Sequence, residues 1–275
     1  MSYAQILVGT DGSPTATRAV GTASRLAAAL GVSLVVATAW QRHPQDPPPP
    51  SQEAVYPAGG GVAGAEATWA TTTTSDAAAV AREAGVSDVR QVQPIGRPAE
   101  ALLRVAEEHP GALLVVGTYG LTDRTERLVG NVPHSLTHHS PVDLLLSIGA
   151  DDEPWATVGL ATDGSPTAAR AVRRGLELSR ALGIEATLLT AARNETAGRT
   201  TLQDVAQQLP GTDRLPLRVA EGTDSSRALT AAAAEFDLLV IGNKGMSGPS
   251  RLLGSVANRI THHVPTDLLL VNTTH

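Results

Sequence analysis

Short apolar segments alternate along the chain with longer stretches in which apolar residues recur at helical spacing. In the first half the short segments are residues 6–9, 33–39, 89–93, 113–117 and 143–148. Their richness in Val, Leu and Ile predicts β-strands, and their continuous hydrophobicity is typical of strands buried on both faces of a parallel sheet. Residues 14–30 carry an apolar stripe with a 3.6-residue period, which predicts a helix after the first strand.

The same pattern occurs twice. The segment DGSPTATRAV at residues 11–20 recurs as DGSPTAARAV at 163–172, with nine identities in ten positions. The segment THHSPVDLLL at 137–146 recurs as THHVPTDLLL at 261–270. Self-similarity of this kind identifies a duplicated structural unit.

Each copy therefore has the pattern of a βαβαβαβαβ unit. The strands of the second copy are TVGLA, EATLLTA, LPLRVA, DLLVIG and DLLLV. This order predicts an α/β protein made of two doubly wound five-stranded parallel-sheet domains. We place the boundary in the acidic, proline-bearing DDEP segment at 151–154, so that the domains are residues 1–150 and 151–275.

The two copies differ in length. The second is 28 residues shorter, and 26 of the missing residues fall between residues 39 and 96 of the first copy. The first copy has four consecutive prolines and three consecutive glycines there, a composition that leaves little apolar surface to bury. We expect residues 42–62 to be the most mobile part of the chain.

The last strand of each copy, DLLLSI or DLLLV, is apolar and is expected at a sheet edge. An exposed apolar edge favours pairing with its own equivalent. We therefore expect the two domains to pack on each other as a pseudo-twofold pair within one chain.

Composition excludes several function classes. The chain has only seven aromatic residues, so its cores must be built from Ala, Val, Leu and Ile. The formal net charge of −6 argues against a broad basic face for nucleic acid or anionic lipid. The lack of cysteine excludes disulfides, thiolate zinc sites and a cysteine nucleophile. With no basic leader and no apolar run near the 20 or so residues that span a bilayer, we expect a soluble cytoplasmic protein.

Candidate chemistry lies after the strands, because open parallel sheets bind ligands outside the carboxyl ends of their strands. Asp11 and Asp163 each follow the first strand of a copy and precede Gly-Ser-Pro. Ser followed by Pro is a typical helix start, which explains those two residues without any ligand. It does not explain the aspartate, whose carboxylate can accept a hydrogen bond from the amino group or sugar of a nucleotide.

Glycines follow the fourth strand of both copies. Gly117 and Gly120 are followed after nine residues by Gly130, whereas Gly242 and Gly245 are followed after eight by Gly254. Glycine lets the backbone approach a ligand closely, and a helix that starts after the last glycine presents free N–H groups to a phosphate. A glycine turn after a strand is common, so one copy alone is weak evidence for a ligand site. Its repetition in both copies strengthens the prediction.

Together the TDGSP segment and the G-x-x-G-(nine residues)-G-[S/T] pattern resemble the universal stress protein family in its tandem two-domain form, over nearly the whole chain. The resemblance implies an adenine nucleotide alpha-hydrolase-like fold that binds ATP or a related adenine nucleotide, with or without Mg²⁺. It also implies dimers that associate through the last strand.

The resemblance assigns nucleotide contacts position by position. In the first copy they are Asp11 and the backbone near Ala39 for adenine, Gly117 and Gly120 for ribose and phosphates, and Gly130 and Asn131 for the phosphate tail. In the second copy they are Asp163, Ala191, Gly242, Gly245, Gly254 and Ser255. Asn131 departs from the small hydroxyl residue of the pattern, and the second copy has one residue too few before Gly254.

The charge of the loop after the fourth strand favours tighter nucleotide binding in the second copy. Residues 117–131 carry no net charge, whereas residues 242–255 carry a net charge of +2 from Lys244 and Arg251. Each added positive charge near a polyphosphate is worth on the order of 1 kcal/mol before salt screening. We expect both copies to bind nucleotide, the second more tightly.

Other enzyme signatures are missing. The sequence contains no G-x-x-x-x-G-K-[ST], G-x-S-x-G or H-E-x-x-H motif. The pairs His138-His139 and His262-His263 are expected at the ends of the fourth helices, where imidazole can cap carbonyl groups. Adjacent helical side chains seldom chelate a metal, and His134 has Asn258 at its repeat position, so we expect no metal site.

The leading hypothesis is a non-catalytic, or very slowly hydrolysing, ATP-binding regulatory protein of the stress response. Nucleotide occupancy would then alter surface loops or the choice of an unidentified protein partner, and a homodimer of the whole chain is left open. One alternative is a nucleotide-free scaffold whose two sites have decayed. Another is a nucleotide-cleaving hydrolase of the same α/β class.

Overall fold

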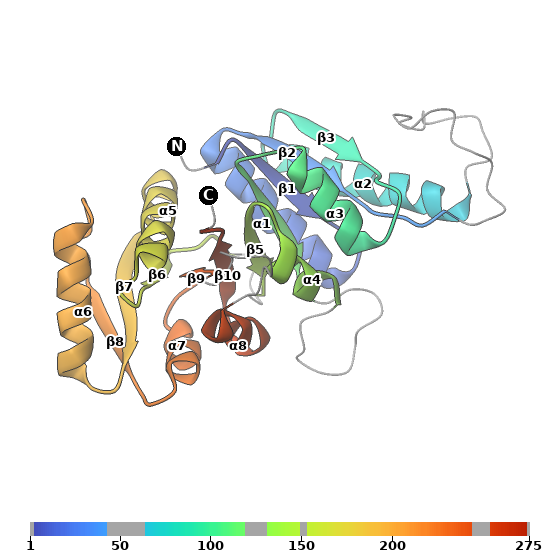
Figure 1. Cartoon of the computed structure of the whole chain (residues 1–275). Helices are drawn as coiled ribbons and strands as arrows, with labels where there is room; N and C mark the ends of the chain where they lie inside the picture. The colour runs from blue at the N-terminus through green and yellow to red at the C-terminus, as the bar shows by residue number, and fades with distance from the viewer. Residues whose placement is uncertain (1–2, 43–63, 119–130, 149–152, 244–253, 274–275) are drawn as a thin grey trace.

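A computed structural model describes five stretches of the chain (Figure 1). They are residues 3–42, 64–118, 131–148, 153–243 and 254–273. Residues 42–62, which we expect to be mobile, lie outside these stretches except for Arg42. Gly120, Gly130 and Gly245 also lie outside them.

The two halves contain the same elements in the same order. In the first half these are β1 (Gln5–Gly9), α1 (Pro14–Leu30), β2 (Ser33–Ala37), α2 (Ala65–Glu83), β3 (Val89–Val92), α3 (Pro98–Glu107), β4 (Ala112–Gly117), α4 (Asn131–His139) and β5 (Asp143–Ser147). In the second half they are β6 (Thr157–Ala161), α5 (Pro166–Leu182), β7 (Glu185–Ala192), α6 (Glu195–Gln208), β8 (Leu217–Glu221), α7 (Ser225–Ala233), β9 (Leu238–Gly242), α8 (Ser255–His263) and β10 (Asp267–Val271).

Strong local signals start and end the long helices. Ser13 caps α1 by accepting a hydrogen bond from the Ala16 amide, and Pro14 fills the first helical position. Gly31 ends the helix in the left-handed conformation, at φ 65°. The second half repeats this arrangement in α5, with Ser165 as the cap and Gly183 at φ 67°.

All ten strands form one sheet in the order β3-β2-β1-β4-β5-β10-β9-β6-β7-β8. Every pairing is parallel except that of β5 with β10, where Leu145 lies opposite its own repeat equivalent, Leu269. The expected pseudo-twofold pair is therefore confirmed, with its axis between these two leucines. Figure 1 shows the two halves meeting at these central strands.

Helices cover both faces of the sheet. One apolar cluster includes residues of α1, α2, α5 and α6, and a second includes residues of α3, α4, α7 and α8. Successive strand residues such as Ile6 and Leu7 belong to opposite clusters, because side chains alternate across a strand. Burial on both faces explains why the central strands are almost entirely apolar.

Two buried aspartates fasten the central strand pair. Asp143 begins β5 and accepts a hydrogen bond from the Asn272 amide at 2.7 Å, just past the end of β10. Asp267 begins β10 and accepts one from the Ile148 amide at 2.7 Å, just past the end of β5. Each carboxylate thus satisfies a backbone N–H group where the ladder of the other strand ends.

An aromatic donor accompanies each aspartate. The Tyr3 hydroxyl donates to Asp143 Oδ2 at 2.9 Å, and Trp155, which occupies the repeat position of Tyr3, donates from Nε1 to Asp267 Oδ2 at 3.0 Å. Arg174 adds an ion pair to Asp143 at 3.2 Å. Burial raises the pKa of both Asp143 and Tyr3.

Imidazole rings of α4 and α8 meet across the pseudo-twofold. The ring centre of His134 lies 4.8 Å from that of His138 and 5.9 Å from that of His262. Burial and the neighbouring imidazoles lower the pKa of His138 and His262 below the ordinary histidine value of 6.5. As expected, both histidine pairs end their helices, and the exposed members, His139 and His263, contact carbonyl oxygens one turn earlier.

We expect acid to destabilise the protein through this cluster. A lowered folded-state pKa means that the unfolded chain binds these protons more readily, so stability is lost as the pH falls below about 6.5. Urea unfolding between pH 7.5 and 5 measures the effect. The double variant His138→Gln and His262→Gln is expected to flatten the pH dependence. The matched pair His139→Gln and His263→Gln is expected to retain it, and an equal effect of both pairs would contradict the assignment.

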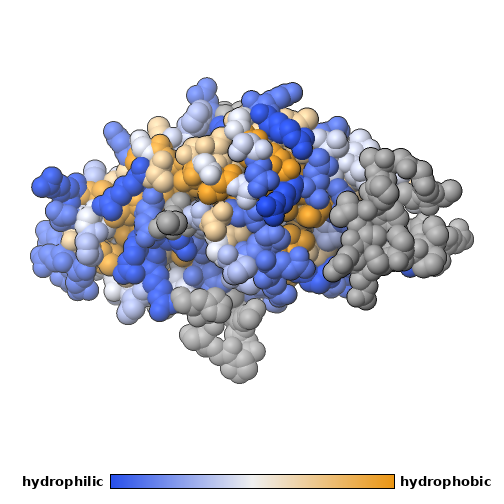
Figure 2. Space-filling model, turned by 90° about the horizontal axis from the view of Figure 1, so that it is seen from above, coloured by the Kyte–Doolittle hydropathy of each residue, from blue (hydrophilic) through white to orange (hydrophobic). Residues whose placement is uncertain are grey.

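The surface of the described residues mixes polar and apolar side chains. In the view from above, hydrophobic residues reach the surface in several places between hydrophilic ones (Figure 2). Among the residues with described positions, the large exposed apolar side chains are Trp69, Val80, Ile95 and Val256. None of the helices in the described ranges is both long and apolar enough to cross a bilayer.

Candidate functional site

The turn after the first strand has the same geometry in both halves. Asp11 Oδ1 accepts a hydrogen bond from the Ser13 amide at 3.0 Å, and Asp163 Oδ1 accepts one from the Ser165 amide at 3.0 Å. The glycine between them adopts a left-handed φ, 75° at Gly12 and 79° at Gly164. One oxygen of each aspartate is therefore part of the turn, which sequence analysis did not anticipate.

The second half contains a cavity of about 480 Å³ at the carboxyl ends of β6 and β9. Its walls come from the end of β6, the start of α5, the end of β7, the starts of α7 and α8, and the end of β9. It is lined by Ala161, Thr162, Asp163, Ser165, Thr167, Ala168, Ala191, Ser225, Leu229, Ile241, Gly242, Gly254, Ser255, Val256, Ala257 and Ile260. Its size falls within the range of about 300–1,000 Å³ that is usual for small-molecule sites.

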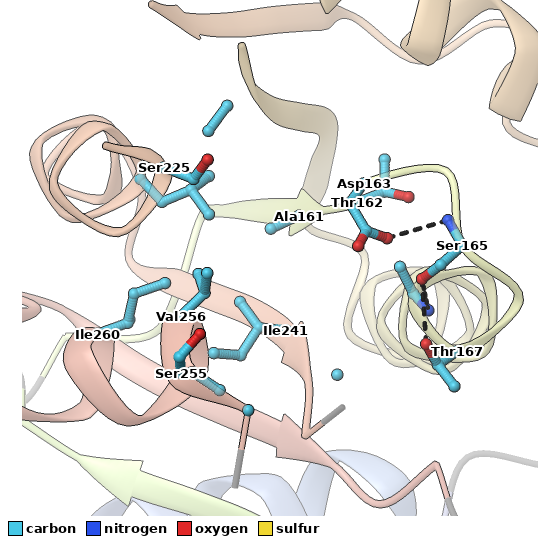
Figure 3. A pocket seen from close by; sticks show the side chains of 16 residues that line it. Ala161, Thr162, Asp163, Ser165, Thr167, Ser225, Ile241, Ser255, Val256 and Ile260 are labelled. Atoms are coloured by element: carbon cyan, nitrogen blue, oxygen red, sulfur yellow. Dashed lines mark hydrogen bonds between the residues drawn. The ribbon is translucent and has the colours of Figure 1, made fainter. Parts of the chain in front are cut away.

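Figure 3 shows two differently built sides of this cavity. Ser255, Val256 and Ile260 of α8 lie with Ser225 of α7 on one side, and Thr162, Asp163, Ser165 and Thr167 lie across from them. Alanine and isoleucine side chains, including Ala161 and Ile241, supply apolar surface between the two sides. This arrangement offers an apolar floor for a ring and polar groups at its ends.

Most of the second-copy residues that sequence analysis selected line this one cavity. They are Asp163, Ala191, Gly242, Gly254 and Ser255. The sixth, Gly245, lies outside the described residues. Among the described side chains that line the cavity, Asp163 is the only carboxylate, and it is exposed.

The first-copy residues lie in matching places of the fold. Asp11 follows β1, Ala39 follows β2, and Gly117 is the last residue of β4. These three strands are neighbours in the order β2-β1-β4, so their carboxyl ends share one edge of the sheet. Asn131 is the first residue of α4.

The two strand-end glycines differ in what surrounds them. A Cβ atom added to Gly117 would lie 2.7 Å from both the carbonyl carbon and the oxygen of Thr15. At Gly242 the nearest atom would be the Thr273 methyl group at 3.4 Å, an ordinary contact. Close packing against the start of α1 therefore accounts for Gly117 without a ligand.

The start of α8 is suited to an anion. Gly254 is its N-cap residue and offers no side-chain acceptor to the free amides of the first turn. That turn contains no acidic residue. Free N–H groups and the positive end of the helix dipole attract phosphate, and both face the cavity through Ser255 and Val256.

Helix α7 also contributes to the cavity, which was not predicted from the sequence. Ser225 and Leu229 line the cavity, and a neighbouring groove of about 330 Å³ runs between the starts of α7 and α8. Asp224 caps α7 and lies 3.4 Å from Arg259, and hydrogen bonds from Ser226 and Arg227 lower the pKa of its carboxyl group. The cap signal at Asp224 marks a helix start but does not reveal which helix packs beside it.

In the parts of the chain with assigned structure, no three His, Asp or Glu side chains are arranged to hold a metal ion. The rings of His134, His138 and His262 pack against one another across the pseudo-twofold. Within the cavity, Asp163 is the one described side chain that suits a hard cation.

Comparison with known proteins identifies the family of this chain. The sequence model of the universal stress protein family matches residues 2–147 and 201–272. A universal stress protein of Mycobacterium tuberculosis is 32% identical over 145 residues, which cover 53% of this chain and 96% of that protein.

Solved structures extend the comparison. A universal stress protein from Archaeoglobus fulgidus matches 99% of this chain and 100% of its own, with a TM-score of 0.70 and 17% identity. A universal stress protein crystallised in complex with cAMP is 32% identical and covers 53% of this chain and 97% of its own, with a TM-score of 0.43. The family match spans more than half of the sequence and the fold match spans nearly all of it. The chain belongs to the universal stress protein family.

Proposed function

We propose that this protein binds an adenine nucleotide, ATP or a close relative, in the cavity of its second half. The observation that carries the proposal is that five second-copy residues, selected from the sequence motifs and the family resemblance, converge on one cavity of ligand size. The apolar floor suits a purine ring, and the uncapped start of α8 suits phosphate. The first half carries the equivalent Asp, Gly and helix start, and we propose a second, weaker site there.

The role we propose is regulatory rather than catalytic. Of the described residues that line the cavity, Asp163 is the only one with a carboxylate and none is a histidine. Its Oδ1 atom already accepts a hydrogen bond from Ser165. This supports binding without a well-placed general base. Single-turnover analysis of ATP with Mg²⁺ or Mn²⁺ tests the point, and product formation beyond a blank reaction would favour a hydrolase.

The proposed phosphate contact at the start of α8 can be tested with a substitution that preserves the fold. Ser255→Asp adds a negative charge at the first position of α8, where an acidic side chain stabilises a helix by about 0.3–1 kcal/mol. The same charge repels phosphate. We expect calorimetry to show ATP affinity at least tenfold lower and adenosine affinity nearly unchanged. Asn131→Asp is the matched variant in the first half and is expected to leave the tighter site intact.

A second variant tests the part of the cavity where we propose that adenine binds. Asp163→Asn keeps the oxygen that the turn needs but replaces the other with an amide N–H₂ group, which cannot accept from the amino group of adenine. We expect adenosine affinity to fall about tenfold, the usual worth of a hydrogen bond to a charged group. Asp11→Asn is the matched control. Equal effects of the two variants would place the tighter site elsewhere.

One measurement separates nucleotide binding from a scaffold with decayed sites. Native mass spectrometry of freshly purified protein reports any co-purified nucleotide and its mass, which also distinguishes ATP, ADP, AMP and cyclic AMP. We expect a bound adenine nucleotide. A chain that is free of nucleotide and does not bind any of these four in titration would favour the scaffold.

A further inference from the structure

A second cavity lies between the two halves, away from the proposed nucleotide site. Its volume is about 140 Å³. One wall is a single face of α1, and the other is formed by the segment before β6 and the end of α5. The residues that matter for its chemistry are Thr22, Arg25, Leu26, Trp155, Leu182 and Ile184.

The pseudo-twofold places a filled counterpart of this cavity at Tyr3. Tyr3 occupies the repeat position of Trp155, and Arg174 occupies that of Thr22. The guanidinium carbon of Arg174 lies 5.0 Å from the centre of the Tyr3 ring, and its Nε lies 3.2 Å from Asp143. An arginine side chain thus covers the aromatic ring in one half.

The other half has no such cover. Thr22 is short, and its hydroxyl accepts a hydrogen bond from Arg25 at 3.3 Å and lies 3.4 Å from the Ser147 hydroxyl. Trp155 keeps its Nε1 bond to Asp267 at 3.0 Å. The space beside the indole is therefore left open, because threonine stands where the equivalent position has arginine.

The lining is apolar with one cationic end. Leu26, Leu182 and Ile184 face the cavity together with the indole of Trp155. Arg25 is half-buried, and in the part of the chain that the structure describes it forms no ion pair. A cation of this kind beside apolar surface is complementary to an anion attached to an apolar group.

The volume sets the size of that apolar group. A cavity of about 150 Å³ holds one benzene molecule. We propose that the cavity binds a small organic carboxylate, with an apolar part of about six carbon atoms against Trp155 and its carboxylate on Arg25. Glu153 is exposed and also lines the cavity, so its negative charge disfavours a doubly charged anion.

Benzoate is a suitable probe, added to the full-length protein. The indole N–H resonance of Trp155 in a ¹⁵N-labelled sample reports the cavity directly, and Trp155→Phe identifies it among the three tryptophans. We expect a saturable shift of this resonance with millimolar or tighter affinity. Benzyl alcohol, which has the same ring without the charge, is expected to bind at least tenfold more weakly.

Three variants and one control variant complete the test. Arg25→Gln is expected to weaken benzoate at least tenfold and to leave benzyl alcohol unchanged. Thr22→Arg recreates the arrangement at Tyr3 and is expected to abolish binding. Ala29→Phe blocks the same wall from an exposed position and serves if Thr22→Arg does not fold. Arg82→Gln, on the exposed surface of α2, is the matched control and is expected to change nothing.

Three outcomes would overturn the proposal. They are an unmoved Trp155 resonance at tens of millimolar benzoate, equal binding of benzyl alcohol, and undiminished benzoate binding in both blocking variants.

Discussion

Replacing Gly117 with alanine is expected to destabilise the protein by about 2–3 kcal/mol, the usual cost of overpacking against atoms that cannot move aside. The new methyl group would lie 2.7 Å from the carbonyl carbon and oxygen of Thr15. Those atoms belong to the backbone of the first turn of α1, which is fixed by the Ser13 cap and cannot yield like a flexible side chain.

The equivalent glycine of the second half, Gly242, provides the control substitution. Gly242→Ala places its methyl group 3.4 Å from the Thr273 methyl and 3.5 Å from the Thr167 carbonyl oxygen, which are ordinary contacts. We expect a change below about 1 kcal/mol. Urea unfolding followed by circular dichroism measures both variants. Equal costs would mean that the start of α1 adjusts, and that packing does not explain the glycine at position 117.

Replacing Asp143 with alanine is expected to cost about 3 kcal/mol or more, as is typical when one member of a buried ion pair is removed. Asp143 accepts hydrogen bonds from Tyr3 and from the Asn272 amide, and it pairs with Arg174. Alanine leaves these donors without their acceptor at the junction of the two halves. The loss is expected in the unfolding free energy of the whole chain, because the central strands belong to one sheet.

A double-variant cycle isolates the ion pair. Removing Arg174 as well, by Arg174→Met, takes away the charge that loses its buried partner in the first variant, so the combined cost is expected to be smaller than the sum of the two. Glu177→Gln is the control, since Glu177 is partly exposed and lies 3.8 Å from Arg174. Strict additivity of Asp143→Ala and Arg174→Met would show that the pair contributes nothing of its own.

The fold was predictable because its signals are local and repeated. The strands at the centre of the sheet are largely apolar, and the Ser-Pro cap and the terminal glycine bound α1 and α5. Because the unit is duplicated, each element could be predicted from two related segments of sequence. Even the central pairing followed from the sequence, since an apolar last strand favours its own equivalent. The second strand is shorter than predicted and ends at Ala37, after which Trp40 forms only an isolated bridge with Ile95.

The contacts between the halves were not predictable, because they depend on side chains far apart in sequence. Asp143 and Asp267 look like ordinary strand starts, and nothing local shows that each reaches the end of the other strand. His134 was judged against its own helix and its repeat partner Asn258. Its contact with His262 follows only from the crossing of α4 and α8.

The candidate site was predictable only in part. Position after parallel strands selected Asp163, Gly242 and the start of α8, and the family resemblance added Ala191. These residues lie together because the carboxyl ends of neighbouring strands meet at one edge. The wall that α7 supplies through Ser225 and Leu229 was missed, since helix packing beside α8 leaves no local signal. Gly117 was selected for approach to a ligand, whereas Thr15 gives it a sufficient packing reason.

The antiparallel pairing of β5 with β10 has a consequence for how the two halves can change. In a pair of identical chains any substitution appears on both sides of the twofold axis. Here the pair is closed within one polypeptide, so each molecule always contains one member of each kind. Thr22 can therefore face Trp155 while Arg174 faces Tyr3, and a division of labour between the halves can be inherited as a single gene product.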